Sequence, residues 1–305
     1  MSEKKIQIGG LAVIEGVMMR GPDQLATAIR KKDGSICIQK KAYVSVTKTH
    51  PVYKLPIIRG FVSIIEMLKI GMETLNYSAK IWETDNIEEV SETSSFRKKL
   101  EEVLPIIVAI VLALLFFGYL PYLISSFLGL AKQNILFNLV SGTIRIAFFV
   151  VYVYCISFMK DIKRVFEYHG AEHKAVFAHE NKAPLTVESV RSFSTIHPRC
   201  GTSFMFFVLL VAIFVFSILD TFVAIYYFVP TPLVRFLYHI PFIPLISGIS
   251  YEILKLSESK MDNPLIRLFT KPGMALQKFT TQQPDDKQIE VAIAALSEAL
   301  TQDTE

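Results

Sequence analysis

Four of the chain's six histidines lie in one polar segment, together with a glutamate and a cysteine. His169 and His173 are four residues apart, so a helix would place both imidazoles on one face, close enough to share a metal ion. Glu172 precedes the second histidine and is a candidate base for a metal-bound water. These types and spacings predict a metal site at His169 and His173 with Glu172 as the catalytic residue.

The pattern H-x-x-E-H is the one used by inverted zincins, in which both histidines bind zinc and the glutamate accepts a proton. Such a site needs a third ligand, and four residues are candidates for it: His197, Cys200, Glu188 and Glu252. We rank His197 and Cys200 first because they form an H-x-x-C ligand pair, and because Cys200 opens the turn into a long apolar run. Zinc is therefore the cofactor that the sequence predicts.

The number of ligands decides what this site does. If His169, His173, His197 and Cys200 all bind zinc, the site is closed and structural, whereas three protein ligands leave a position open for water. A metal-free alternative also stands, in which the histidines and neighbouring charges form a hydrogen-bonded cluster at a membrane surface. The spacing alone leaves these alternatives open.

The composition indicates a membrane protein. Of 305 residues, 51% are hydrophobic and 20% charged, and the mean hydropathy is +0.40, which is too apolar for a soluble domain of this size. No apolar segment typical of a signal peptide is expected at the N-terminus. The three cysteines are scattered, which disfavours a disulfide framework. A net charge of +4 without clustering predicts no nucleic-acid partner.

We predict a mainly α polytopic membrane protein with about four transmembrane helices. The transmembrane domain covers 102–258, and its apolar runs are long enough to cross a bilayer; the predicted spans are 103–129, 137–159, 203–226 and 236–256. Lysines and arginines are concentrated before the first span and after the second and fourth. This pattern predicts a multi-pass protein of the cell membrane, with both termini and the His-rich segment 160–202 in the cytoplasm.

A cytoplasmic N-terminal region, 1–101, is predicted to contain short strands at 25–30, 35–39 and 42–47. It continues into an amphipathic helix at 56–79 and a polar linker at 80–101. The glycine-punctuated stretch 9–22 lacks the ending of a phosphate loop, so we do not predict nucleotide binding. Residues 259–305 are expected to form a cytoplasmic tail of short helices, the last capped by Asp285 or Asp286.

Four motifs, distributed over nearly the whole chain, resemble the bacterial YqhQ family. They are Gly9–Pro22, Phe166–Lys174, the H-P-R-C-G-T-S stretch from His197 to Ser203, and the region from Gly273 to Leu296. The family is described as predicted metal-dependent membrane enzymes, so the resemblance implies a metal-dependent enzyme in the membrane. It implies no particular reaction or substrate.

Together these features favour a zinc-dependent hydrolase, for example a peptidase, that acts at the cytoplasmic face on a membrane-associated substrate. The alternative is a non-enzymatic factor in membrane-protein biogenesis, in which the His/Cys cluster is structural and the cytoplasmic regions bind a protein partner. A transporter is disfavoured because the spans show no internal repeat. The bilayer is the one partner that the sequence predicts directly, and the oligomeric state is left open.

Overall fold

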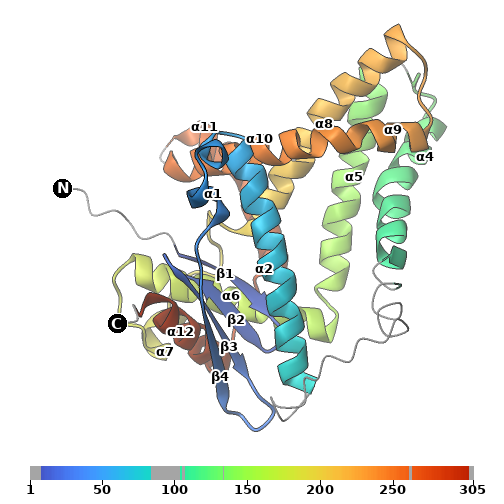
Figure 1. Ribbon diagram of the computed structural model, residues 1–305. Helices are drawn as coiled ribbons and strands as arrows, with labels where there is room; N and C mark the ends of the chain where they lie inside the picture. The colour runs from blue at the N-terminus through green and yellow to red at the C-terminus, as the bar shows by residue number, and fades with distance from the viewer. Residues whose placement is uncertain (1–7, 84–103, 105–106, 133, 261–262, 302–305) are drawn as a thin grey trace.

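The computed structural model describes residues 8–83, 104, 107–132, 134–260 and 263–301. Figure 1 shows a small sheet covered by helices at one end of the molecule, and long helices that extend away from it. This is the mainly helical architecture with a small N-terminal sheet that the sequence predicts.

The sheet is a four-stranded antiparallel meander in the order β1-β2-β3-β4, formed by Gly9–Val13, Gly16–Arg20, Gln24–Arg30 and Ile36–Ala42. The glycine-punctuated stretch therefore forms the first hairpin. The sequence of this hairpin lacks the usual alternation of apolar and polar residues because β2 is buried on both faces. Val17, Met18 and Met19 are all fully buried. The predicted strand at 42–47 is wrong, because Ser45 caps a short helix, α1 (Val46–Thr49).

Two helices cover one face of this sheet, α6 (Lys160–Glu180) and α12 (Asp286–Leu300). Ile289, Ala292 and Leu296 of α12 are buried in the same core as Val17 and Ala28 of the strands. Asp285, one of the two predicted caps, is the N-cap residue of α12 and forms a reciprocal capping box with Gln288. The helix that the sequence placed in a C-terminal tail is thus part of the central core.

Helix α2 (Ile58–Glu83) lies along the other side of the sheet and contacts β1 and β3. It extends beyond the predicted amphipathic helix and takes in the first residues of the predicted linker. The linker residues from 84 to 101 lie outside the described residues. At its beginning α2 packs closely on α10 (Ile243–Ser259), where Gly60 lies against Gly248 and Tyr251.

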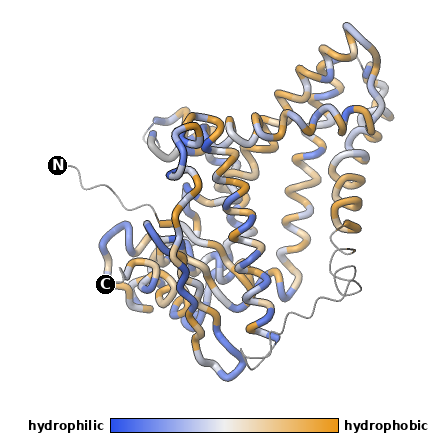
Figure 2. The backbone as a smooth tube through the Cα atoms, viewed as in Figure 1, coloured by the Kyte–Doolittle hydropathy of each residue, from blue (hydrophilic) through white to orange (hydrophobic). Residues whose placement is uncertain are grey.

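Within the described residues, four helices are long and apolar enough to cross a membrane, as the sequence predicts: Ile107–Phe127, Ile135–Ile156, Gly201–Tyr226 and Pro232–Ser257. The first includes η3 (Leu114–Tyr119) and α4 (Leu120–Phe127), the second is α5, the third is α8, and the fourth joins α9 (Pro232–His239), η4 (Ile240–Phe242) and α10. Figure 2 shows hydrophobic residues along much of these helices. Exposed apolar side chains such as Phe214, Ile218, Phe222 and Ile225 of α8 suit contact with lipid.

Several charged residues inside these helices have polar partners. Asp220 of α8 is buried and accepts bonds from Arg235 Nη1 at 3.0 Å and His239 Nε2 at 2.7 Å. Arg145 of α5 donates from Nε to the carbonyl oxygen of Phe117 at 2.8 Å. The bonds of Asp220 join α8 to α9 and that of Arg145 joins α5 to η3, as expected for polar groups among apolar helices.

Helix α11 (Pro264–Thr280) continues through Pro272, where the sequence predicted two separate helices. It packs along the beginning of α8, with Gly273 against Ser203. Two shorter elements, η1 (Pro51–Lys54) and α7 (Val187–Arg191), complete the described structure. Helices α6, α8 and α11 therefore meet where the sheet adjoins the apolar helices.

Candidate metal centre

Helix α6 carries most of the candidate site, and the first hairpin fixes its position. Glu15, in the turn between β1 and β2, pairs with Arg164 through Oε2 and Nη2 at 2.6 Å and accepts from the hydroxyl of Tyr168 at 3.2 Å. Glu15 therefore lies beside the start of α6. Strand β1, which precedes Glu15 in the chain, extends from there along the helix. This arrangement brings Gly10, at the start of β1, against Glu172 one turn beyond Tyr168.

Three predicted ligands come together. The ligand atoms of His169, His173 and Cys200 all lie within 4.8 Å of one another. Nε2 of His169 is 3.3 Å from Sγ of Cys200, and the two imidazole centroids are 4.5 Å apart. The spacing of four residues therefore places both imidazoles on one face of α6, as expected for a helix. Cys200 lies against them from the beginning of α8.

Backbone carbonyls orient both imidazoles. Nδ1 of His169 donates to the carbonyl oxygen of Thr280 at 2.8 Å, and Nδ1 of His173 donates to that of Thr195 at 2.5 Å. Because a carbonyl oxygen can only accept, Nδ1 of each ring carries the hydrogen and Nε2 keeps its lone pair. Burial also lowers the pKa of His173, which favours the neutral ring. Carbonyl partners of this kind are typical of histidines that bind a metal through Nε2.

Cys200 is the N-cap residue of α8, and its Sγ accepts from the backbone N–H of Thr202 at 3.4 Å. The hydroxyl of Thr202 also lies 3.0 Å from the sulfur. The beginning of a helix favours negatively charged groups through its partial positive charge. A thiolate at this position would thus be stabilised by the helix that follows it.

Glu172 lies beside the cluster, with Oε2 at 3.6 Å from His173 Nε2 and 4.0 Å from His169 Nε2. Its side chain is buried, and this burial raises the pKa of its carboxyl. A Cβ at Gly10 would lie 2.7 Å from Cγ of Glu172. The glycine therefore allows the carboxylate to reach the backbone of β1.

His197 lies close to the cluster but is not in the group of three. Its ring is 5.7 Å from that of His173. Its Nδ1 accepts from the backbone N–H of Arg199 at 3.2 Å, and its Nε2 is 3.4 Å from Oε2 of Glu180. An imidazole that accepts at Nδ1 carries its hydrogen on Nε2 when neutral, so this ring presents no lone pair to the cluster. The prediction that His197 binds the metal has no support in this arrangement.

The other two candidates for the third ligand lie elsewhere. Glu252 of α10 pairs with Arg59 of α2, with Nε at 2.7 Å from Oε1. Glu188 is exposed on α7. Neither belongs to the metal-ligand group found among the described residues. Glu252 instead holds α2 against α10.

Several residues that position the cluster gave no signal in the sequence. Gln277 of α11 accepts from the backbone N–H of His197 at 2.8 Å and donates to its carbonyl oxygen at 2.8 Å. Thr195 and Thr280 act through their carbonyls, and Gly170 lets the carbonyl of Gln282 pass close to α6. Backbone groups of this kind cannot be found from side-chain patterns, because any residue type supplies them.

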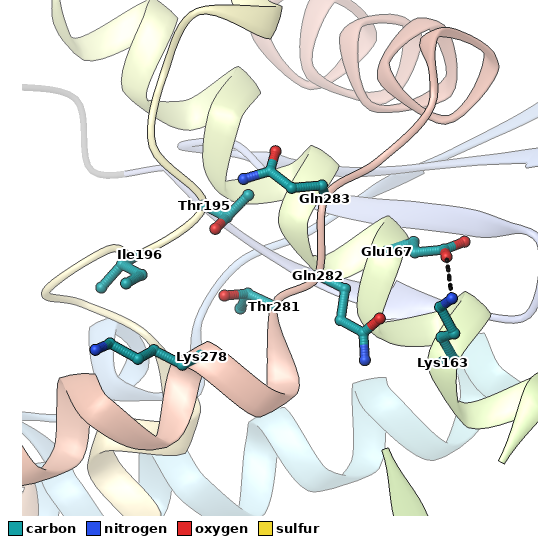
Figure 3. Close-up of a pocket in the computed structure, with 8 residues that line it drawn as sticks. All are labelled: Lys163, Glu167, Thr195, Ile196, Lys278, Thr281, Gln282 and Gln283. Atoms are coloured by element: carbon teal, nitrogen blue, oxygen red, sulfur yellow. Dashed lines mark ion pairs between the residues drawn. The ribbon is translucent and has the colours of Figure 1, made fainter. Parts of the chain in front are cut away.

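A polar cavity of about 540 Å³ lies beside the cluster (Figure 3). It shares Thr195 with the cluster, and Thr281 on its wall follows Thr280. Lys163 and Glu167 of α6 form an ion pair at 4.0 Å on one side of it. The remaining wall is formed by Ile196, Lys278, Gln282 and Gln283. The loops that orient the two imidazoles therefore also border this cavity.

Fold and site together define a class of protein: apolar helices of membrane-spanning length joined to an α/β layer, with a His/His/Cys group at the junction. The chain belongs to the family described as "Protein of unknown function (DUF1385)", which matches residues 55–302. It is 37% identical over 311 residues to the "Uncharacterized protein YqhQ" of Bacillus subtilis (strain 168), covering 98% of this chain and 95% of that protein.

The predicted resemblance to the YqhQ family is thus confirmed, and neither description names an activity. No solved structure matches the chain. Any functional conclusion must therefore come from the geometry of the site.

Proposed function

We propose that this protein is a metal-dependent hydrolase of the bacterial inner membrane, in which His169, His173 and Cys200 hold a zinc ion and Glu172 is the general base. One observation carries the proposal: three ligand atoms lie within 4.8 Å of one another next to a buried carboxylate. Three protein ligands leave a coordination position open, as in catalytic zinc sites, whereas structural sites use four.

The donor set fits zinc in particular. Two imidazole nitrogens and a thiolate are borderline to soft ligands, which suit Zn²⁺ and disfavour Mg²⁺ and Ca²⁺. The carbonyls of Thr195 and Thr280 hold both Nε2 lone pairs toward the same point. When bound, the ion supplies a Lewis acid that makes a nearby water more acidic.

Glu172 is the residue placed to accept that proton. Its Oε2 lies within 4.0 Å of both ligand nitrogens, beside the place where an ion held by them would lie, and a general base must lie within hydrogen-bonding reach of the water it activates. Gly10 lies against the side chain of Glu172, and the burial of that side chain limits competing solvent. Glu172 would take a proton from the attacking water and pass it to the leaving group.

We place the site and both termini on the cytoplasmic side. Lys160, Lys163 and Arg164 follow the second apolar helix at the start of α6, and cytoplasmic segments carry an excess of such residues. The cluster lies on that same helix, close to the beginning of the third apolar helix. A substrate that is bound to the membrane or emerges from it would reach the site most directly.

A second function is favoured by the contacts of the same residues. The cluster and Gln277 join α6, α8 and α11, and Cys200 lies within hydrogen-bonding distance of His169. These side chains would then be structural, as in a factor that binds or assembles other membrane proteins.

Metal analysis of the purified full-length protein separates these functions. A hydrolase of the proposed kind holds about one zinc per chain, and Glu172→Gln keeps that zinc but loses hydrolysis of an unfolded casein. Wild-type protein that remains metal-free after growth in zinc and gentle purification contradicts the proposal. Retained zinc with unchanged cell phenotype in Glu172→Gln supports the structural alternative instead.

A further inference from the structure

Strand β1 forms one edge of the sheet and passes directly beside the candidate site. The strand order makes β1 and β4 the two edges. Each edge presents backbone N–H and C=O groups that no neighbouring strand satisfies. Only the β1 edge lies near the described metal cluster, because Gly10 contacts Glu172.

The register shows which groups of β1 face outward. Val13 pairs with Gly16 across a two-residue turn, Leu11 with Met18, and Gly9 with Arg20. In an antiparallel pair, hydrogen-bonded and non-hydrogen-bonded positions alternate, and the closing pair of a two-residue turn is hydrogen-bonded. Leu11 and Val13 thus bond to β2, and the backbone groups of Gly10 and Ala12 point away from the sheet.

One hydrogen bond agrees with this assignment. The N–H of Ile14, the next outward position after Ala12, donates to Oγ of Ser78 on α2 at 3.3 Å. A side chain therefore occupies the outward donor on one side of Ala12, and on the other side Gly10 lies against the side chain of Glu172.

Ala12 itself remains available within the part of the chain that the structure describes. No hydrogen bond to its N–H or C=O from described residues is found, and the residue is half-exposed. Helix α6 lies on one side of β1 and α2 on the other. At Gly9 no atom lies within 4 Å of a Cβ position, so the approach to this end of the strand is open.

We propose that the β1 edge binds an extended polypeptide, the substrate of the adjacent site, through a residue paired with Ala12 by two backbone hydrogen bonds. Addition of a strand to a sheet edge recognises main chain and is largely independent of side chains. Residues two apart in a strand are separated by roughly 6.6 Å. The bound chain therefore continues past Gly10, where its next peptide bond lies beside Glu172.

The inference rests on the proposed function and names its substrate class. Hydrolysis there consumes one water: its oxygen forms a bond to the peptide carbonyl carbon, and the C–N bond breaks. Glu172 takes one hydrogen of the water as a proton and delivers it to the departing nitrogen. The products are a carboxylate and an amine, and no further reactant is required.

Hydrogen exchange measured by mass spectrometry tests the docking without relying on turnover. Full-length Glu172→Gln protein in lipid nanodiscs is mixed with reduced, carboxymethylated casein, which is unfolded and is not consumed. We expect exchange in segment 9–14 to slow about tenfold or more at saturating casein. Exchange in segment 36–42, the β4 edge, stays unchanged. Unchanged exchange in segment 9–14 overturns the inference.

A proline substitution supplies the second measurement. Ala12→Pro removes the outward N–H while leaving the bonds of β1 to β2, so the KM for casein should rise about tenfold, the factor expected from one lost hydrogen bond. Its kcat and zinc content should match wild type. Ala42→Pro, at an outward position of β4, is the matched control. An unchanged KM in Ala12→Pro overturns the inference even where exchange slows.

The two proposals fail in different ways. Zinc-free wild type without hydrolysis removes the proposed function, whereas slowed exchange in segment 9–14 then identifies the edge as a peptide-binding site of another kind. Zinc-dependent hydrolysis without any protection of segment 9–14 keeps the hydrolase and removes the edge. If Ala12→Pro does not fold, the exchange measurement decides alone, because it uses no change in β1.

Discussion

Sγ of Cys200 lies 3.3 Å from Nε2 of His169, although the two residues are far apart in the sequence. The intervening loop is held in place by Gln277, which bonds both backbone groups of His197, three residues before the cysteine. Cys200 then begins α8. The site thus depends on α11 as much as on the two motifs that carry its ligands.

Removing a ligand should remove the metal. We expect His173→Ala and Cys200→Ala to lower the zinc content from about one per chain to near zero, because two remaining ligands bind zinc weakly. His179→Ala, on the same helix but outside the cluster, is the control and should retain zinc. Metal analysis by mass spectrometry measures each. Full zinc in His173→Ala would exclude this site as its location.

Removing His197 should have a different effect. Because its ring bonds Arg199 and Glu180, we expect His197→Ala to retain zinc while lowering stability by about 1 to 3 kcal/mol, the cost of leaving buried polar partners unsatisfied. Thermal unfolding in detergent and zinc content, measured on the same sample, give both quantities. Loss of zinc without loss of stability would make His197 a ligand and the site closed.

The absence of a side chain at position 10 should matter for activity. In Gly10→Ala the new Cβ would lie 2.7 Å from both Cγ of Glu172 and the carbonyl oxygen of Met18, so the carboxyl must move. We expect kcat to fall by roughly 10²-fold, the contribution of a positioned base, with zinc retained. Gly9→Ala is the matched control, since no atom lies within 4 Å there. Equal kcat in both variants would mean that this contact does not position Glu172.

The ion pair between Arg59 and Glu252 should couple α2 to α10. Both side chains are about a quarter exposed, at 29% and 25%, so a double-mutant cycle with alanine should give a coupling free energy of about 0.5 to 1 kcal/mol. The exposed pair Lys69 and Glu73, 4.0 Å apart, should couple less strongly. Unfolding in nanodiscs is the measurement. Equal coupling in the two pairs would show that the contact contributes nothing beyond a surface pair.

The proposed orientation can be tested with single cysteines. In a background with Cys37→Ser and Cys155→Ser, Lys182→Cys should react with an impermeant maleimide only after the membrane is opened. Val229→Cys, in the turn between the third and fourth apolar helices, should react in intact cells. The parent protein, which keeps only the buried Cys200, is the control for labelling of that cysteine. The reverse labelling pattern would invert the topology.

The long apolar helices and the start of α12 could be predicted because their signals are local: uncharged runs for the first, and Asp285 before an amphipathic stretch for the second. The burial of Leu296 against the sheet could not be predicted, because nothing in the sequence of α12 indicates which distant strand the helix contacts. The strand that contains Val17 to Met19 was not predicted, because both of its faces are covered.

The same distinction applies to the site. The spacing of His169 and His173 predicts a shared face on α6, and the structure has it. The position of His197 outside the group of three depends on its contacts with the N–H of Arg199 and the carboxylate of Glu180. Sequence spacing gives ligand types but does not say which ring nitrogen is already bonded.

The packing of α12 on the first strands sets an order of events during synthesis. The sheet is made first, yet its apolar face is not fully covered until α12 leaves the ribosome, after all four apolar helices. Contacts between residues this far apart in sequence form slowly. The nascent chain must therefore keep this face of the sheet partly uncovered while all four apolar helices are being made.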